Sequence, residues 1–146
     1  MAYYQYTTWT PALETGHAVI DEQHKHLFAA VNDLFEALKS GKGGKEVEQT
    51  LSFLVDYTHE HFNDEEELQQ KYDYPEHLAH KQFHEEFKET AQKFASKLLF
   101  RSSPTEEFVS DVCHTIGRWV FDHIKAEDFK MTTYILSKEQ NGTSLN

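Results

Sequence analysis

The amino-acid sequence predicts an all-α protein: an antiparallel up-and-down four-helix bundle with an N-terminal arm and a short C-terminal helix. Three observations indicate this fold class. Apolar residues recur at helical spacing over four long segments, the connections between these segments are short and polar, and no stretch alternates apolar and polar residues as a half-buried strand would. A chain of 146 residues is expected to form one domain, residues 1–146, with a core of its own.

The N-terminal arm is expected over residues 1–19, which are rich in Tyr and Thr. The first helix is expected from about Ile20 to the segment SGKGG, because its apolar residues follow the i, i+3, i+4, i+7 pattern. A second helix is expected to end near the segment YDYPE. Its apolar stripe consists of Val47, Leu51, Leu54, Val55 and Phe62.

The third helix is expected from about Glu76, and its apolar residues are Phe83, Phe87, Phe94 and Leu98. The segment RSSPTEE predicts the start of the fourth helix, with Ser103 as N-cap, Pro104 at the first helical position and Glu106 completing a capping box. One face of that helix carries Val109, Val112, Ile116, Trp119 and Val120.

The C-terminal part is expected to be a short helix over the apolar segment FKMTTYIL, followed by a polar tail over residues 137–146. The tail matches no ligand motif, and the sequence gives it no role.

The composition excludes several classes of protein. A net charge of −11 argues against nucleic acid and anionic membranes as partners, since both require basic patches. A lone Cys113 cannot form an internal disulfide. No apolar run reaches membrane-spanning length, and the N-terminal segment lacks the pattern of a signal peptide. The chain is therefore expected to be soluble and cytoplasmic.

Five histidines and one glutamate continue the apolar stripes at positions where leucine would be expected. They come from all four helices: His24, His61, Glu65, His80, His84 and His123. A buried carboxylate such as Glu65 is costly unless it is neutralised, paired or bound to a metal. Because no Lys or Arg shares this part of the stripes, a metal site is the simplest explanation.

The topology gives an independent argument for that site. In an up-and-down bundle the first helix's start, the second's end, the third's start and the fourth's end lie together. The six candidates occupy these four places, and at about 1.5 Å rise per residue they reach a common layer. Asp128 lies five residues after His123, about 140° around a straight helix, so both can bind one centre only if the helix ends or bends between them.

A single inward histidine is more often a hydrogen-bonded core residue than a metal ligand, but four helices converging on one layer favour the metal site. The other five histidines lie off the stripes, in the arm or near a helix start. They are expected to be exposed surface residues: His17, His26, His59, His77 and His114.

Four stretches around these residues, IDEQHKHLF, HEHFNDEE, HLAHKQFH and WVFDHIKAED, resemble the hemerythrin family, in particular the single-domain bacteriohemerythrins. The resemblance implies two non-heme iron ions joined by an oxo or hydroxo bridge. It assigns one iron to His80, His84 and His123, the other to His24 and His61, and the role of bridging carboxylates to Glu65 and Asp128. It also implies an O2 pocket lined by Leu27, Phe62, Trp119 and Val120.

With these ligands one iron is six-coordinate and the other five-coordinate, and the open position is where O2 is expected to bind. Five neutral imidazoles support high-valent iron less well than a carboxylate-rich set, so reversible O2 binding for transport, storage or delivery is expected, rather than an enzyme. Two alternatives stay open: a di-iron enzyme that handles peroxide or nitric oxide, and an O2 or iron sensor. An O2-consuming enzyme or a signalling partner would fit these functions, and the oligomeric state is not predicted.

Overall fold

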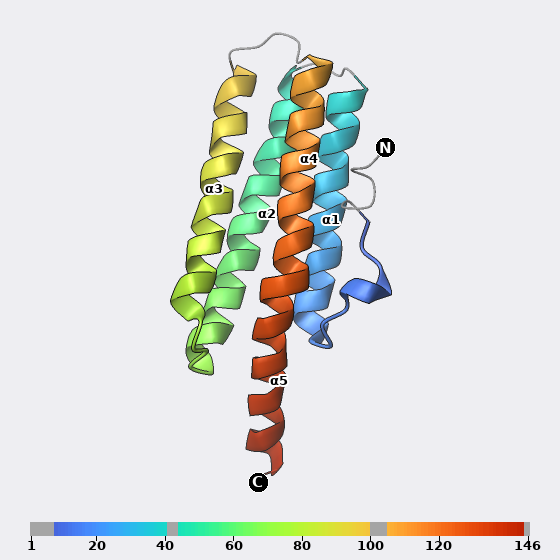
Figure 1. The fold of residues 1–146 in the computed structure, drawn as a ribbon. Helices are drawn as coiled ribbons and strands as arrows, with labels where there is room; N and C mark the ends of the chain where they lie inside the picture. Colours follow the sequence, from blue (N-terminus) through green and yellow to red (C-terminus); the bar gives the residue numbers. More distant parts are fainter. Residues whose placement is uncertain (1–7, 41–43, 100–104, 145–146) are drawn as a thin grey trace.

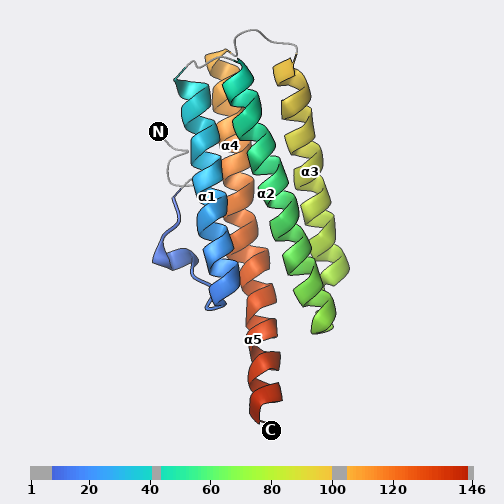
Figure 2. The same cartoon turned by 180° about the vertical axis from the view of Figure 1, so that it is seen from behind.

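Four long helices form an antiparallel bundle in the computed structural model, which describes residues 8–40, 44–99 and 105–144. The bundle helices are α1 (Ala18–Lys39), α2 (Gly44–Lys71), α3 (His77–Leu99) and α4 (Glu106–His123). Figures 1 and 2 show the four helices side by side, with neighbours in sequence running in opposite directions. The predicted fold class is confirmed.

The fourth helix does not end at the bundle. After α4 the chain forms a π-helical turn, Ile124–Asp128, and continues as α5 (Phe129–Ser144). In Figure 1, α5 projects beyond the ends of the other helices. The C-terminal helix was predicted, but the helix is longer than expected, because it includes residues 137–144, which the sequence suggested were a polar tail.

Two local predictions need correction. The N-cap of α4 is Thr105, whose Oγ1 accepts a hydrogen bond from the Phe108 N–H at 3.1 Å; Ser103 and Pro104, predicted for this start, lie outside the described residues. Phe83, predicted to be in the apolar stripe of α3, is 37% exposed. The Leu98 side chain is also outside the described part.

Two apolar clusters fill the interior. The larger one runs the length of the bundle and includes Leu34, Leu54, Phe87 and Ile116. The smaller one lies where α5 begins, and consists of Ile20, Tyr74, Met131 and Ile135. The candidate metal ligands lie towards the same end as this second cluster. None of the described helices has a stretch long and apolar enough to cross a membrane.

The arm is attached to the start of α1 by one carboxylate. Asp21, in the first turn of α1, is only 7% exposed and accepts hydrogen bonds from the Thr15 N–H (2.8 Å), the Thr15 hydroxyl (2.7 Å) and the Gly16 N–H (3.1 Å). Gly16 has φ +92°, a conformation that glycine adopts readily, and this lets the chain turn back towards Asp21. A short 3₁₀ turn, Pro11–Leu13, then places Leu13 in the core.

Replacing this carboxylate is expected to destabilise the fold. Asp21→Ala removes the acceptor of three hydrogen bonds and should lower the free energy of unfolding by about 2–3 kcal/mol, measured by urea denaturation. Glu22→Ala, at an exposed neighbouring position, should change it by less than about 0.5 kcal/mol. Equal losses in the two variants would mean that Asp21 does not anchor the arm.

Candidate metal centre

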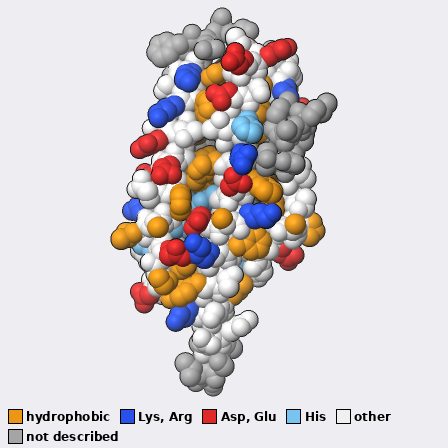
Figure 3. Space-filling model, viewed as in Figure 1, with side chains coloured by type: hydrophobic (Ala, Val, Ile, Leu, Met, Phe, Trp, Pro, Cys, Tyr) orange, Lys and Arg blue, Asp and Glu red, His pale blue; other side chains and the backbone are white. Residues whose placement is uncertain are grey.

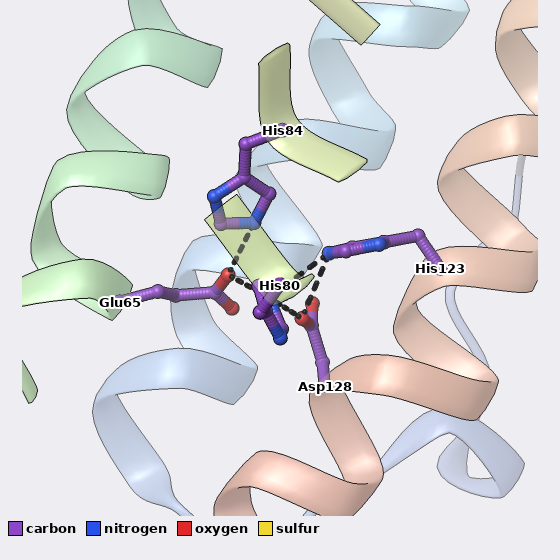
Figure 4. Close-up of side chains that lie close together, drawn as sticks. All are labelled: Glu65, His80, His84, His123 and Asp128. Carbon is purple, nitrogen blue, oxygen red and sulfur yellow. Dashed lines mark hydrogen bonds and ion pairs between the residues drawn. The ribbon is translucent and has the colours of Figure 1, made fainter. Parts of the chain in front are cut away.

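Seven side chains from all four bundle helices and the π turn meet at one level of the bundle. They are His24 on α1, His61 and Glu65 on α2, His80 and His84 on α3, His123 at the end of α4, and Asp128 at the end of the π turn. Figure 4 shows five of them pointing towards one another: Glu65 from α2, His80 and His84 from α3, His123 from α4 and Asp128 from the π turn. His123 is the most exposed of the seven, at 6%, so all seven side chains are buried.

The seven residues form two overlapping groups. We define the three-histidine group as Glu65, His80, His84, His123 and Asp128, and the two-histidine group as His24, His61, Glu65 and Asp128. Within each group, one potential ligand atom per residue lies within 4.8 Å of all the others. Both carboxylates belong to both groups.

Each carboxylate turns one oxygen towards each group. Glu65 Oε1 lies 3.2 Å from His84 Nε2 and 3.4 Å from His80 Nε2, while Glu65 Oε2 lies 3.2 Å from His61 Nε2 and 3.6 Å from His24 Nε2.

Asp128 repeats this arrangement. Its Oδ1 is 3.1 Å from the Nε2 atoms of His80 and His123, and its Oδ2 is 2.9 Å from His24 Nε2. Two carboxylates that each face two imidazole groups have the arrangement required to bridge two metal ions.

The π turn explains how His123 and Asp128 reach the same place. In a straight α-helix, residues five apart point in different directions, and the sequence therefore suggested that the helix ends or bends here. Instead the chain widens into a π turn, in which the Phe129 N–H bonds to the Ile124 carbonyl, so residues five apart are stacked on one face. The helix continues, and Asp128 Oδ1 comes within 3.1 Å of His123 Nε2.

The charges in the cluster are balanced by histidines. Burial alone raises the pKa of the Glu65 carboxyl, but the neighbouring His61, His24 and His80 outweigh it and hold that pKa well below its usual range. Burial and the nearby Glu65 also raise the pKa of Asp128, yet the contacts with His123 and His24 bring it below the ordinary value. Both carboxylates are therefore charged at neutral pH.

The imidazoles respond to these two charges. Burial lowers the pKa of His24 and of His80, but the contacts with Asp128 and Glu65 dominate and raise the two pKa values to about 9 and about 10. Desolvation lowers the pKa of His123 below its ordinary value. Metal ligands must be deprotonated, so metal binding at this cluster would release protons.

Unsatisfied polar atoms indicate that the cluster fits metal ions. Both oxygens of Glu65, Asp128 Oδ1 and His84 Nε2 are buried, and none has an aligned hydrogen-bond partner in the described part of the chain, although imidazoles lie 3.1–3.6 Å from these oxygens. The residues that carry these atoms all belong to the two groups whose potential ligand atoms lie within 4.8 Å of one another. Imidazole nitrogen and carboxylate oxygen together suit iron, zinc or manganese, so this cluster can hold metal.

Hydrogen-bonding partners outside the cluster fix the orientation of two of the imidazoles, His61 and His84. His84 Nδ1 lies 3.0 Å from Glu66 Oε2, and His61 Nδ1 lies 2.8 Å from Gln23 Oε1. Such partners direct the other ring nitrogen towards a metal. The sequence analysis missed both residues; the available signal was position alone, since Gln23 precedes His24 and Glu66 follows Glu65.

Aromatic rings cover the three-histidine group. The ring of Phe62 stacks on His84 at 3.7 Å between centroids, and the Trp119 ring stacks on His123 at 4.5 Å. A surface groove of about 530 Å³ between α3 and α4 is lined in part by Trp119 and His123, on a face where apolar side chains gather (Figure 3). Leu27 and Val120 are buried in the large apolar cluster. That Leu27, Phe62, Trp119 and Val120 line an O2 pocket stays a prediction.

The five histidines expected outside the site are indeed absent from both groups. Three are exposed as predicted: His26, His59 and His114. The prediction of exposure is wrong for His17, which is the N-cap of α1 and accepts a hydrogen bond from the Ile20 N–H, and for His77, whose Nδ1 lies 2.8 Å from Gln69 Oε1. Both are half-buried structural residues.

The fold and the cluster together define a helical-bundle protein with a buried metal site of imidazoles and carboxylates. Comparison with known proteins agrees. The family described as "Hemerythrin HHE cation binding domain" matches residues 15–135. The chain therefore belongs to the hemerythrin family.

Individual relatives cover most of the chain. A bacteriohemerythrin of Stenotrophomonas maltophilia is 36% identical over 121 residues, 82% of this chain and 75% of that protein. A myohemerythrin of Theromyzon tessulatum is 30% identical over 122 residues, 84% of this chain and 88% of the relative. A crystal structure of wild-type hemerythrin superposes with a TM-score of 0.77 at 28% identity, covering 88% of this chain and 96% of that one.

Substitution of histidines inside and outside the cluster should separate ligands from bystanders. His61→Ala and His84→Ala each remove an imidazole that faces a shared carboxylate, and we expect each variant to bind less metal per chain than the unsubstituted protein, measured by elemental analysis after reconstitution. His26→Ala, His59→Ala and His114→Ala are matched controls and should retain full metal content. Full occupancy in both cluster variants would refute the assignment.

Proposed function

We propose that this protein binds O2 reversibly at a non-heme di-iron centre and serves as an O2 carrier, store or delivery protein. His80, His84 and His123 would hold one iron, and His24 and His61 the other. The observation that carries the proposal is that Glu65 and Asp128 each present one oxygen to each histidine group. The names of the relatives, bacteriohemerythrin and myohemerythrin, support the same assignment.

The two halves of the centre offer different numbers of ligands. The three-histidine group supplies three nitrogens and two carboxylate oxygens, and an oxo or hydroxo bridge between the irons would complete six-coordination there. The two-histidine group supplies one ligand fewer and so leaves a position open. When bound, the irons would supply that open position and the electrons that reversible O2 binding requires.

The protein's own residues restrict what else can happen at this position. The five imidazoles are neutral as ligands and the two carboxylates are shared, so the ligand set carries little negative charge and supports high-valent iron poorly. Leu27 and Val120 are buried and lie one turn from His24 and His123, which belong to different halves of the centre, so their apolar side chains would slow the entry of water and anions into the centre. Both features favour release of intact O2 over oxygenation.

The direct test is O2 uptake by protein loaded with ferrous iron under anaerobic conditions. We expect the visible spectrum to change on exposure to air with one O2 taken up per chain, and to return when the solution is purged with argon. Catalytic consumption of O2, peroxide or nitric oxide over many turnovers, without stoichiometric reversible uptake, would replace the carrier with an enzyme.

Removal of the metal should destabilise the protein. Without metal, two carboxylates and five imidazoles stay buried at one level, whereas metal binds only the folded chain and adds its binding free energy to stability. The iron-loaded protein should therefore melt at a higher temperature than the apo-protein in differential scanning calorimetry. Equal melting temperatures would contradict this coupling.

Truncation of the apolar wall should affect the iron more than distant truncations do. Leu27→Ala and Val120→Ala should each cost about 2–5 kcal/mol of stability, as core truncations do, and also accelerate autoxidation and azide entry in folded, iron-loaded protein. Leu38→Ala is the control: its side chain is equally buried but lies about 21 Å along α1 from His24, at about 1.5 Å per residue. Equal autoxidation rates in all three variants would argue against the pocket.

A further inference from the structure

Gln23 connects α1 to the metal centre through its side-chain amide. Its Oε1 lies 2.8 Å from Nδ1 of His61, and its Nε2 donates a hydrogen bond to Asp64 Oδ2 at 2.8 Å. The Gln23 carbonyl also accepts a hydrogen bond from the Tyr57 hydroxyl at 3.1 Å. Tyr57, His61 and Asp64 follow one another along a single face of α2, so Gln23 is held at three points on that helix.

The Asp64 carboxylate determines which way the Gln23 amide points. A charged carboxylate can only accept hydrogen bonds, so the NH2 group of Gln23 has to face Asp64 and its oxygen has to face His61. That oxygen is also only an acceptor, and therefore His61 carries its proton on Nδ1. The lone pair of His61 then lies on Nε2, which points into the centre, 3.2 Å from Glu65 Oε2.

The corresponding contact in the other half is charged. His84 Nδ1 faces the Glu66 carboxylate at 3.0 Å, whereas His61 Nδ1 faces a neutral amide. A carboxylate draws the Nδ1 proton more strongly than an amide does, and so makes the imidazole a stronger donor to its metal. Nδ1 of His24 and of His80 has no hydrogen-bond partner among the described residues. The charge of the partner at Nδ1 of His84 and of His61 is therefore a clear difference between the two halves.

We infer that Gln23, oriented by Asp64, is a positioning residue that fixes the tautomer of His61 and keeps this ligand a weaker donor than His84. The inference rests on the proposed function, in which the two-histidine half holds the iron with the open position. A weaker donor set stabilises the ferric state less, so an iron held by His61 stays ferrous more readily. The neutral amide therefore opposes loss of the O2-binding form by oxidation.

The first experiment removes the amide and measures metal binding. Gln23→Leu should bind one of its two metal ions about 10–100-fold more weakly, measured with zinc in competition with a chelator, because outer ligand partners contribute about this much. Gln70→Leu is a matched control, since the exposed Gln70 contacts His77, a histidine outside the cluster. Unchanged zinc affinity in Gln23→Leu would overturn the positioning role.

The second experiment moves the charge without removing the hydrogen bonds. The double substitution Gln23→Glu with Asp64→Asn keeps the net charge and both hydrogen bonds but places a carboxylate against His61. We expect a lower midpoint potential for the loaded iron and faster autoxidation than in the unsubstituted protein. An unchanged or higher potential would overturn the inference.

Both readouts are independent of O2 binding. Zinc affinity and an anaerobically measured potential test Gln23 even in a protein that takes up no O2, and in that case only the proposed function fails. In zinc-loaded protein, nitrogen-15 NMR of His61 should show the proton on Nδ1, and a proton on Nε2 would contradict the assigned tautomer.

Discussion

The rest of the structure depends on one constraint, the burial of two carboxylates at the same level of a four-helix bundle. Neither carboxylate has a lysine or arginine partner in the described part of the chain. Glu65 and Asp128 are both fully buried, and their ion-pair partners there are all histidines. An isolated buried carboxylate would destabilise the folded protein by more free energy than most single interactions contribute. The imidazoles that surround the pair make its burial possible, and with the two carboxylates they form two groups of potential ligand atoms.

The bundle supplies this environment because of where each helix begins and ends. His24 is near the start of α1 and His123 at the end of α4, and the antiparallel topology places these ends beside those of α2 and α3. The π turn then places Asp128 beside His123, and the first turns of α5 pack Met131 and Ile135 against Ile20 and Tyr74 at that end. The centre is thus held by rigid helices on all sides, which restricts the distances between its ligands.

Much of this arrangement could be predicted from residue spacing. Period-3.6 stripes identify the four helices, and the same stripes place six of the seven cluster residues on inward faces. Features that depend on contacts between helices could not be predicted. His17 and His77 look like surface histidines in the sequence, because their partners are a backbone N–H and the side chain of Gln69. Phe83 follows the apolar stripe of α3 but lines the surface groove. Gln23 and Glu66 follow no periodic pattern, and the π turn arises from a local hydrogen-bond shift that spacing does not reveal.

The metal content of the reconstituted protein tests the central claim most directly. After anaerobic loading with ferrous iron, removal of excess metal and exposure to air, we expect two irons per chain by elemental analysis. Prolonged oxidation should then give the visible and near-ultraviolet absorption of an oxo-bridged ferric pair. One metal ion per chain, or a site that retains only zinc and shows no such absorption, would contradict the account.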